Sequence, residues 1–200
     1  MLTNHRQPNE HVLASERENF VRCLHLLSCT HESQEAEGFI TNALGAVKRT
    51  FDELTGDRCA CTLKMCSHDG TVSTWLRDRE SPPLRYSAVC RFPSQLNSAF
   101  RELQCSRKFT YYLSNNLTAD RTYENVNPDW KDHYNAVLVA SIRSNIFDHT
   151  RSADIMGFLC VDNFHGGFTT LGGVALSSFA HDLFNAISSV HWTMNSGHSN

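Results

Sequence analysis

The feature that most constrains the fold is an apolar segment near the carboxyl end of the chain, Ile155–Phe164. Two glycines follow it in the turn His165–Phe168, and a helical pattern begins at Thr169. An apolar run that is rich in branched and aromatic side chains and bounded by turn residues predicts a buried strand. We therefore expect a strand over 155–163 that directly precedes the last helix.

Three long segments carry apolar residues at helical spacing, over about 9–31, 33–54 and 170–192. Such spacing places an apolar stripe on each helix, and the stripe is expected to pack on a core. Gly56 stands just after the second segment, where a residue in the left-handed conformation commonly ends a helix. The last helix carries its stripe at alternating intervals of four and three residues: Leu176, Ala180, Leu183, Ile187, Val190 and Met194.

Alternation of side-chain type predicts strands over 58–67 and 71–76. Asp69-Gly70 stands between them and is a strong signal for a hairpin turn. In this alternation Thr62 and Lys64 share one face of the first strand. The other predicted elements are strands over 109–113, 136–142 and 155–163 and short helices over 94–103 and after Asn127-Pro128.

The order of these elements predicts an α+β fold. We expect a central antiparallel sheet of five to six strands, with the long N- and C-terminal helices packed on one face. A lid built from loops and a short helix would cover the other face. In this organisation residues 1–32 form an N-terminal helical extension, 33–192 form the domain and 193–200 form a flexible tail.

Composition and charge argue against several classes of partner. The formal net charge is −3 and no basic block occurs, so neither nucleic acid nor an anionic membrane surface is expected. No apolar run approaches the roughly 20 residues of a membrane helix, and the polar N-terminus lacks the apolar core of a secretory signal. We therefore expect a cytoplasmic protein whose eight cysteines are reduced thiols.

Motifs that carry chemistry are sparse. Cys59, Cys61 and Cys66 lack the paired Cys-x-x-Cys spacing of a zinc site, so we interpret them as small buried hydrophobic residues. The histidines are scattered, and neither a Gly-x-Ser-x-Gly elbow nor a Walker loop occurs. The sequence therefore predicts no catalytic residues, no metal site and no cofactor.

Two segments resemble adjacent strands of GAF domains, the small sensor modules of signalling proteins. They are 135–142, Asn-Ala-Val-Leu-Val-Ala-Ser-Ile, and the strand from Gly157 to Asp162, which fits the closing G-hydrophobic-hydrophobic-x-hydrophobic-D pattern of that family. The resemblance covers about 33–190 and implies a GAF-like fold with a regulatory role. No output domain is visible in the sequence, which leaves a standalone sensor, an excised fragment or a module whose output partner is a separate protein. Asp162 itself is interpreted as ending the strand and capping the turn.

The polar segment 115–135 is the first candidate for ligand binding, because it interleaves hydrogen-bonding groups with aromatic rings that can stack on a planar ligand. In GAF domains the corresponding segment forms the lid of the pocket, and the resemblance implies the same place here. From the sheet, Lys64 and Arg143 are expected to face the same cavity and to meet an anionic group. The alternative is an exposed loop whose aromatic residues attach it to the sheet. The candidate residues in the segment are Asn115, Asn116, Tyr123, Asp129, Trp130, His133 and Tyr134.

These observations predict a non-enzymatic sensory or regulatory domain in signal transduction that binds a small molecule under the lid. We also expect a homodimer through the terminal helices, because Phe179, Phe184 and Trp192 add apolar surface beyond one stripe. Two alternatives remain open. One is an interaction module without a ligand, and the other is a small redox enzyme of the methionine sulfoxide reductase type that uses Cys90 or Cys105. Some GAF sensors bind haem through one histidine, and His133 is the first candidate for that role.

Overall fold

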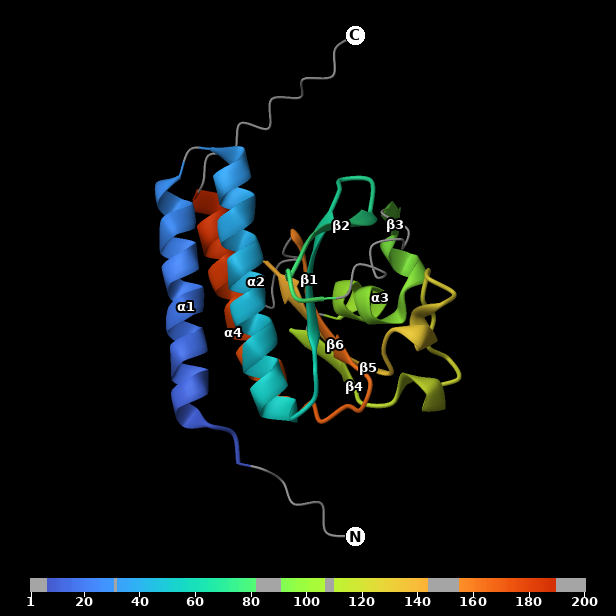
Figure 1. The fold of residues 1–200 in the computed structure, drawn as a ribbon. Helices are drawn as coiled ribbons and strands as arrows, with labels where there is room; N and C mark the ends of the chain where they lie inside the picture. Colours follow the sequence, from blue (N-terminus) through green and yellow to red (C-terminus); the bar gives the residue numbers. More distant parts are fainter. Residues whose placement is uncertain (1–6, 31, 82–90, 107–109, 144–154, 190–200) are drawn as a thin grey trace.

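The computed structural model describes residues 7–30, 32–81, 91–106, 110–143 and 155–189. The helices are α1 (Glu10–Cys29), α2 (Ser33–Thr55), α3 (Ser98–Cys105) and α4 (Thr170–Ser189), with the short 3₁₀ turns η2 (Ser94–Leu96), η3 (Leu117–Ala119) and η4 (Trp130–Asp132). The strands are β1 (Ala60–Cys66), β2 (Thr71–Arg77), β3 (Arg91–Pro93), β4 (Tyr111–Ser114), β5 (Ala136–Ile142) and β6 (Gly157–Asn163). They form three layers: α1, α2 and α4 on one side, the sheet in the middle, and a cover that contains α3 on the other side (Figure 1).

The six strands of the described chain form one antiparallel sheet in the order β3-β2-β1-β6-β5-β4. β6 lies in the middle, between β1 and β5, and all of its residues are buried. Cys160 of β6 stands opposite Thr62 of β1 on one side and Val139 of β5 on the other. The predicted α+β fold with an antiparallel sheet is thus confirmed.

Helix ends follow the expected chemistry. Asn9 caps α1, since its side chain accepts a hydrogen bond from the backbone N–H of His11 at 3.1 Å. Gly56 ends α2 with a φ of +69°, as its place in the sequence predicts. The predicted helix over 94–103 is divided, because Asn97 interrupts it after η2 and caps α3 through the N–H groups of Ala99 and Phe100.

Some predicted features differ from the structure or lie outside it. β3 was not expected, because a three-residue strand that ends in proline shows no alternation and the proline indicates a break. The tail predicted over 193–200 and the residues Cys90 and Trp192 lie outside the described residues.

On the helix side of the sheet, α1 and α4 pack together through Phe20 and Phe179. Their rings meet edge to face with centroids 4.6 Å apart. Phe179 is therefore covered within the chain and does not supply the dimer surface that we expected of it, because α1 already occupies that stripe. The exposed apolar side chains of this layer are Val21 and Leu26 on α1 and Leu171 and Val174 on α4.

A second apolar cluster lies on the opposite face of the sheet. Phe100 of α3 stacks on Phe158 of β6 with ring centroids 4.4 Å apart, and on Phe92 of β3 with centroids 6.0 Å apart. Such aromatic pairs contribute about 0.5–1.5 kcal/mol each beyond their buried area. They hold α3 against the sheet and form one wall of the cavity described next.

Candidate functional site

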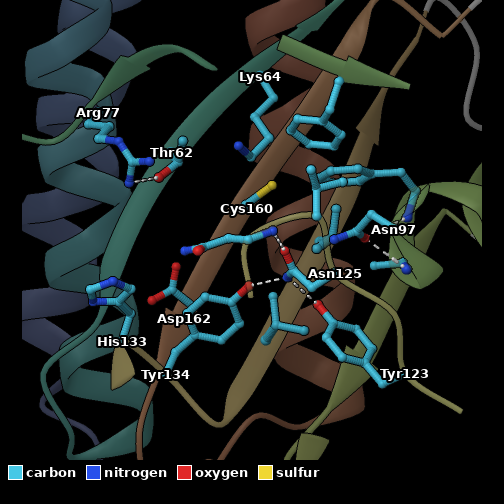
Figure 2. Close-up of a pocket in the computed structure, with 17 residues that line it drawn as sticks. Thr62, Lys64, Arg77, Asn97, Tyr123, Asn125, His133, Tyr134, Cys160 and Asp162 are labelled. Carbon is cyan, nitrogen blue, oxygen red and sulfur yellow. Dashed lines mark hydrogen bonds between the residues drawn. The ribbon is translucent and has the colours of Figure 1, made fainter. Parts of the chain in front are cut away.

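A cavity of about 100 Å³ lies between the sheet and its cover. Side chains of β1, β5 and β6 form its floor, and the walls come from β3, α3 and the irregular segment 123–134 (Figure 2). We call this segment the lid. Alternate residues of a strand point to the same face of a sheet, which is why Thr62 and Lys64 of β1 and Cys160 and Asp162 of β6 all reach the cavity.

Lys64 is the most unusual side chain of the floor. Its Nζ donates a hydrogen bond to Oγ1 of Thr74 at 2.8 Å and lies 5.5 Å from the centre of the Phe92 ring. Burial lowers the pKa of Lys64 below its ordinary value, because leaving water disfavours the charged amine. Arg77, from the end of β2, adds a second cation and donates to Oγ1 of Thr62 at 3.3 Å.

A hydrogen-bonded group of two tyrosines and an asparagine organises the lid. Nδ2 of Asn125 donates to the hydroxyl oxygen of Tyr134 at 2.6 Å and to that of Tyr123 at 3.2 Å (Figure 2). Oδ1 of Asn125 accepts from the backbone N–H of Asn127 at 3.0 Å. Burial raises the pKa of Tyr123 and raises that of Tyr134 well above its ordinary value, so both hydroxyls are neutral.

Four of the predicted site residues line the cavity: Lys64, Tyr123, His133 and Tyr134. Trp130 stands behind the lining, with its ring centre 5.2 Å from that of Tyr123 and 5.7 Å from that of Tyr134. It holds the two tyrosines in place without being part of the cavity surface.

The other four predicted residues do not line the cavity. Asp129 is exposed before η4, and Asn116 caps η3 by accepting from the N–H of Ala119 at 3.2 Å. Asn115 instead bonds the backbone of Phe168 in both directions, each bond 2.8 Å long. Arg143 is buried at the end of β5, where burial lowers its pKa.

Asp162 corrects the interpretation made from the sequence. It does not cap the turn but lies within β6, paired between Ala60 and Val137, and lines the cavity. The cap is its neighbour Asn163, whose Oδ1 accepts from the Gly166 N–H at 2.8 Å while its Nδ2 donates to the Gly166 carbonyl at 2.9 Å. The sequence does show that Asp162 follows Cys160 by two positions and therefore shares its face of the strand. It does not show that this face meets the cavity, because that depends on the pairing of β6 with β1.

The described residues contain no group of three or more histidine, cysteine, aspartate or glutamate side chains placed to hold a metal ion. His133 does line the cavity, as the haem hypothesis requires. However, a cavity of about 100 Å³ is small beside the roughly 300–1,000 Å³ of pockets for drug-sized ligands. A haem therefore does not fit this site.

No helix in the described part of the chain is long and apolar enough to cross a membrane.

The described cysteines fall into two groups of different expected reactivity. Cys29 and Cys105 are exposed, whereas burial raises the pKa of the Cys59 and Cys160 thiols to about 12. Because the thiolate is the nucleophile, iodoacetamide at pH 8 should modify Cys29 and Cys105 and leave Cys160 unmodified until the protein unfolds. Peptide mapping by mass spectrometry measures this.

The raised pKa values of Cys59 and Cys160 also predict how the stability of the folded state changes at alkaline pH. The folded state holds the protons of Cys59 and Cys160 up to about pH 12, whereas an exposed cysteine thiol, as in the unfolded chain, loses its proton near 9.0. The folded state is therefore expected to lose stability as the pH rises from about 9 towards 12. Rapid modification of Cys160 in the folded protein at pH 8 would contradict this assignment.

Comparison with known proteins identifies the fold. No protein-family model matches the sequence, and no curated protein does. Among solved structures, the chain is similar to the GAF domain of an Acinetobacter phosphoenolpyruvate-protein phosphotransferase, with a TM-score of 0.57 and 12% identity over 88% of this chain and 95% of that one. The chain is also similar to the free methionine-R-sulfoxide reductase of Neisseria meningitidis, with a TM-score of 0.62 and 12% identity over 95% of this chain and 98% of that one. For the chromophore-binding domain of an R. palustris bacteriophytochrome the TM-score is 0.55 and the identity 13%, over 88% of this chain and 61% of that one. At such identities the similarity shows a GAF-like fold.

Proposed function

We propose that this chain is a sensory or regulatory domain that binds a small molecule in the cavity beneath the lid. The observation that carries the proposal is the composition of the cavity wall. Charged and amide groups stand on or beside the floor, aromatic rings form the sides, and the lid residues are fixed by hydrogen bonds to one another. A small apolar enclosure with a few directed polar groups is the usual form of a ligand site.

Hydrogen bonds from the cover to the start of α4 support a regulatory role. The Asn135 N–H, directly after the lid, donates to the Asn163 carbonyl at 2.9 Å, and Asn163 holds Gly166. Asn115 holds Phe168, just before α4 begins. A ligand that moves Tyr134 would therefore act on Asn135, which is linked through the hydrogen bonds of Asn163 to the turn that leads into α4. In this proposal Asn115 and Asn135 transmit the movement to α4 and do not contact the ligand.

The sensor is proposed to act as a homodimer through the layer of α1 and α4. Four large apolar side chains of these helices are between 41% and 76% exposed, which is the kind of surface that a partner covers. We propose that a second copy of the chain covers them and that α4 carries the ligand signal to it.

The redox-enzyme alternative has one observation in its favour, since two of the solved structures of this fold are free methionine-R-sulfoxide reductases. Cys105 is exposed and stands outside the cavity, so it does not meet a ligand bound there. Cys160 does line the cavity, but its thiol has a pKa of about 12. The other cysteine of this alternative, Cys90, lies outside the described residues. On the evidence of the described cysteines we propose a binding function without turnover.

Native mass spectrometry of the protein as purified tests the proposal. We expect a small molecule bound at one per protomer in spectra that also report a dimer. Val139→Phe, which fills the cavity from β5, should abolish the bound mass, whereas His68→Phe, in the exposed turn between β1 and β2, should retain it. Circular dichroism checks that both variants fold. A bound mass that survives Val139→Phe, or chemical conversion of the ligand during incubation, would reject this function.

A further inference from the structure

Three asparagines line the cavity, and each uses its side-chain carbonyl oxygen to hold the backbone. Oδ1 of Asn97 accepts from two N–H groups in the first turn of α3, at 3.0 and 3.3 Å. Oδ1 of Asn125 accepts from the Asn127 N–H at 3.0 Å, and Oδ1 of Asn127 accepts from the Asp129 N–H at 3.0 Å. The amide atom that each of them retains for the cavity is therefore Nδ2, which only donates hydrogen bonds.

The two tyrosines of the lid add a further donor. Nδ2 of Asn125 donates to both hydroxyl oxygens, so neither hydroxyl can donate to Asn125. Asn97, whose carbonyl oxygen is occupied, also meets Tyr123 as a donor. Both hydroxyls keep their protons, because burial raises the pKa of Tyr123 and of Tyr134, and one of the two protons can go to the other hydroxyl. Among the described residues at least one tyrosine proton thus has no acceptor, and an oxygen of a ligand can take it.

Lys64 supplies donors on another side of the cavity. Its Nζ carries three protons, and one of them is donated to Oγ1 of Thr74 at 2.8 Å. Figure 2 shows this amine on one side of Cys160 and the hydroxyls of Tyr123 and Tyr134 on the other. A ligand in the cavity therefore lies between hydrogen-bond donors of the floor and of the lid.

The charged groups of the lining carry a small excess of positive charge. Lys64 and Arg77 supply two positive charges and Asp162 supplies one negative charge, so the lining has a net charge of +1 when histidine is counted as neutral. Arg77, His133 and Asp162 each have a partner within the protein. Asp162 also favours the charged form of Lys64. A ligand does not have to neutralise these groups, but the excess charge favours an anionic acceptor over a neutral one.

We infer that the cavity binds a short aliphatic carboxylate, whose oxygens accept hydrogen bonds from a lid tyrosine, from Nδ2 of Asn127 and from the amine of Lys64. This inference rests on the proposed function, because it names the ligand class of the same cavity. A carboxylate has two accepting oxygens and no donor, which matches the donors of the lining. Its hydrocarbon chain would meet the apolar part of the lining, which includes Phe92, Phe100 and Val139. The cavity volume of about 100 Å³ is below the roughly 150 Å³ of a cavity that holds benzene, so the chain has only a few carbon atoms.

Isothermal titration calorimetry with probes of similar size tests the inference. Propionate is an anion that only accepts hydrogen bonds, propionamide is a neutral molecule of the same shape that also donates, and propylammonium is a cation that only donates. We expect saturable binding of propionate, or of the shorter acetate or the longer butyrate. Propionamide should bind more weakly by about tenfold or more, because hydrogen bonds to a charged acceptor are about twice as strong as those to a neutral one. Propylammonium should not bind.

Two substitutions that add the same charge separate a direct contact from a general effect of charge. In Asn127→Asp one oxygen still accepts from the Asp129 N–H, while the other replaces the donor Nδ2 by a negatively charged acceptor. Propionate should then bind more weakly by about tenfold or more, because like charges repel each other strongly at such a short distance. Asn116→Asp adds an equal charge outside the cavity and keeps the bond to the Ala119 N–H, so the affinity should change by less than about twofold. Circular dichroism checks that both variants fold.

Three results would contradict the inference. Propionamide or propylammonium that binds as tightly as propionate overturns it, and so does an unchanged propionate affinity in Asn127→Asp. A co-purified ligand that carries no carboxylate overturns it while leaving the proposed function intact. If no carboxylate binds and no ligand co-purifies, the inference and the proposed function both fail.

Discussion

Gly157→Ala is expected to destabilise the protein by more than about 3 kcal/mol, the upper end of the usual cost of overpacking a core. A Cβ at this position would lie 2.2 Å from the carbonyl oxygen of Lys64, a contact that no real side chain tolerates. The obstacle is backbone, and β6 is paired on both sides, with Gly157 opposite Met65 and Ile142. The strand therefore has no direction in which to move. Chemical denaturation measured by circular dichroism gives the loss of unfolding free energy.

Gly38→Ala supplies the matched control for this substitution. Nothing lies within 4 Å of a Cβ built on Gly38, which lies inside α2, in its second turn. Because glycine costs about 0.5–1 kcal/mol relative to alanine inside a helix, the control should become slightly more stable. Similar stabilities for the two variants would show that β1 and β6 are not as closely packed at Gly157 as described.

The close packing at Gly157 also explains why the sequence around it indicated the fold. Gly157 opens the pattern that resembles a GAF strand, and its physical role is to let β6 approach the backbone of β1. Long helices and central strands produce strong periodic patterns, because each buries a full face. β3 produces no such pattern, since three residues at a sheet edge bury little and end in Pro93.

The candidate site was predictable only in part, and the reason is the difference between local and tertiary information. The lid was located because amides and aromatics are concentrated within one segment, and Tyr123, His133 and Tyr134 do line the cavity. Asp162 reaches the cavity beside residues of β1, which is distant from β6 in the sequence, so its place depends on the pairing of β1 with β6. Arg77 was missed for a different reason: the hairpin of β1 and β2 was predicted, but the predicted second strand ended at residue 76. Asn115 was assigned to the ligand because the sequence around it does not show that its side chain hydrogen-bonds the backbone of Phe168.

Asp78→Ala is expected to cost about 3–5 kcal/mol, because the carboxylate is fully buried and several donors depend on it. It accepts from the N–H of Cys61 at 2.8 Å, from the Ser81 hydroxyl at 2.6 Å and from the N–H of Glu80 at 3.0 Å. Alanine would leave these donors without a partner, and each buried orphan costs about 1–3 kcal/mol. Thermal and urea unfolding measure the loss.

Asp69→Ala is the control, because Asp69 also accepts several hydrogen bonds but its side chain is 55% exposed. Water replaces the lost partners there, so we expect a loss below about 1 kcal/mol. The Asp78 variant should also affect the cavity, since Asp78 directly follows Arg77 and its carboxylate, which alanine removes, accepts from the Cys61 N–H at 2.8 Å. The turn that it fixes carries Glu80, which pairs with Lys48 and thereby joins the end of β2 to α2. An equal loss of unfolding free energy in the two variants would mean that burial of the carboxylate does not decide the cost. The pairing of β2 alone would then have to hold Arg77 in position.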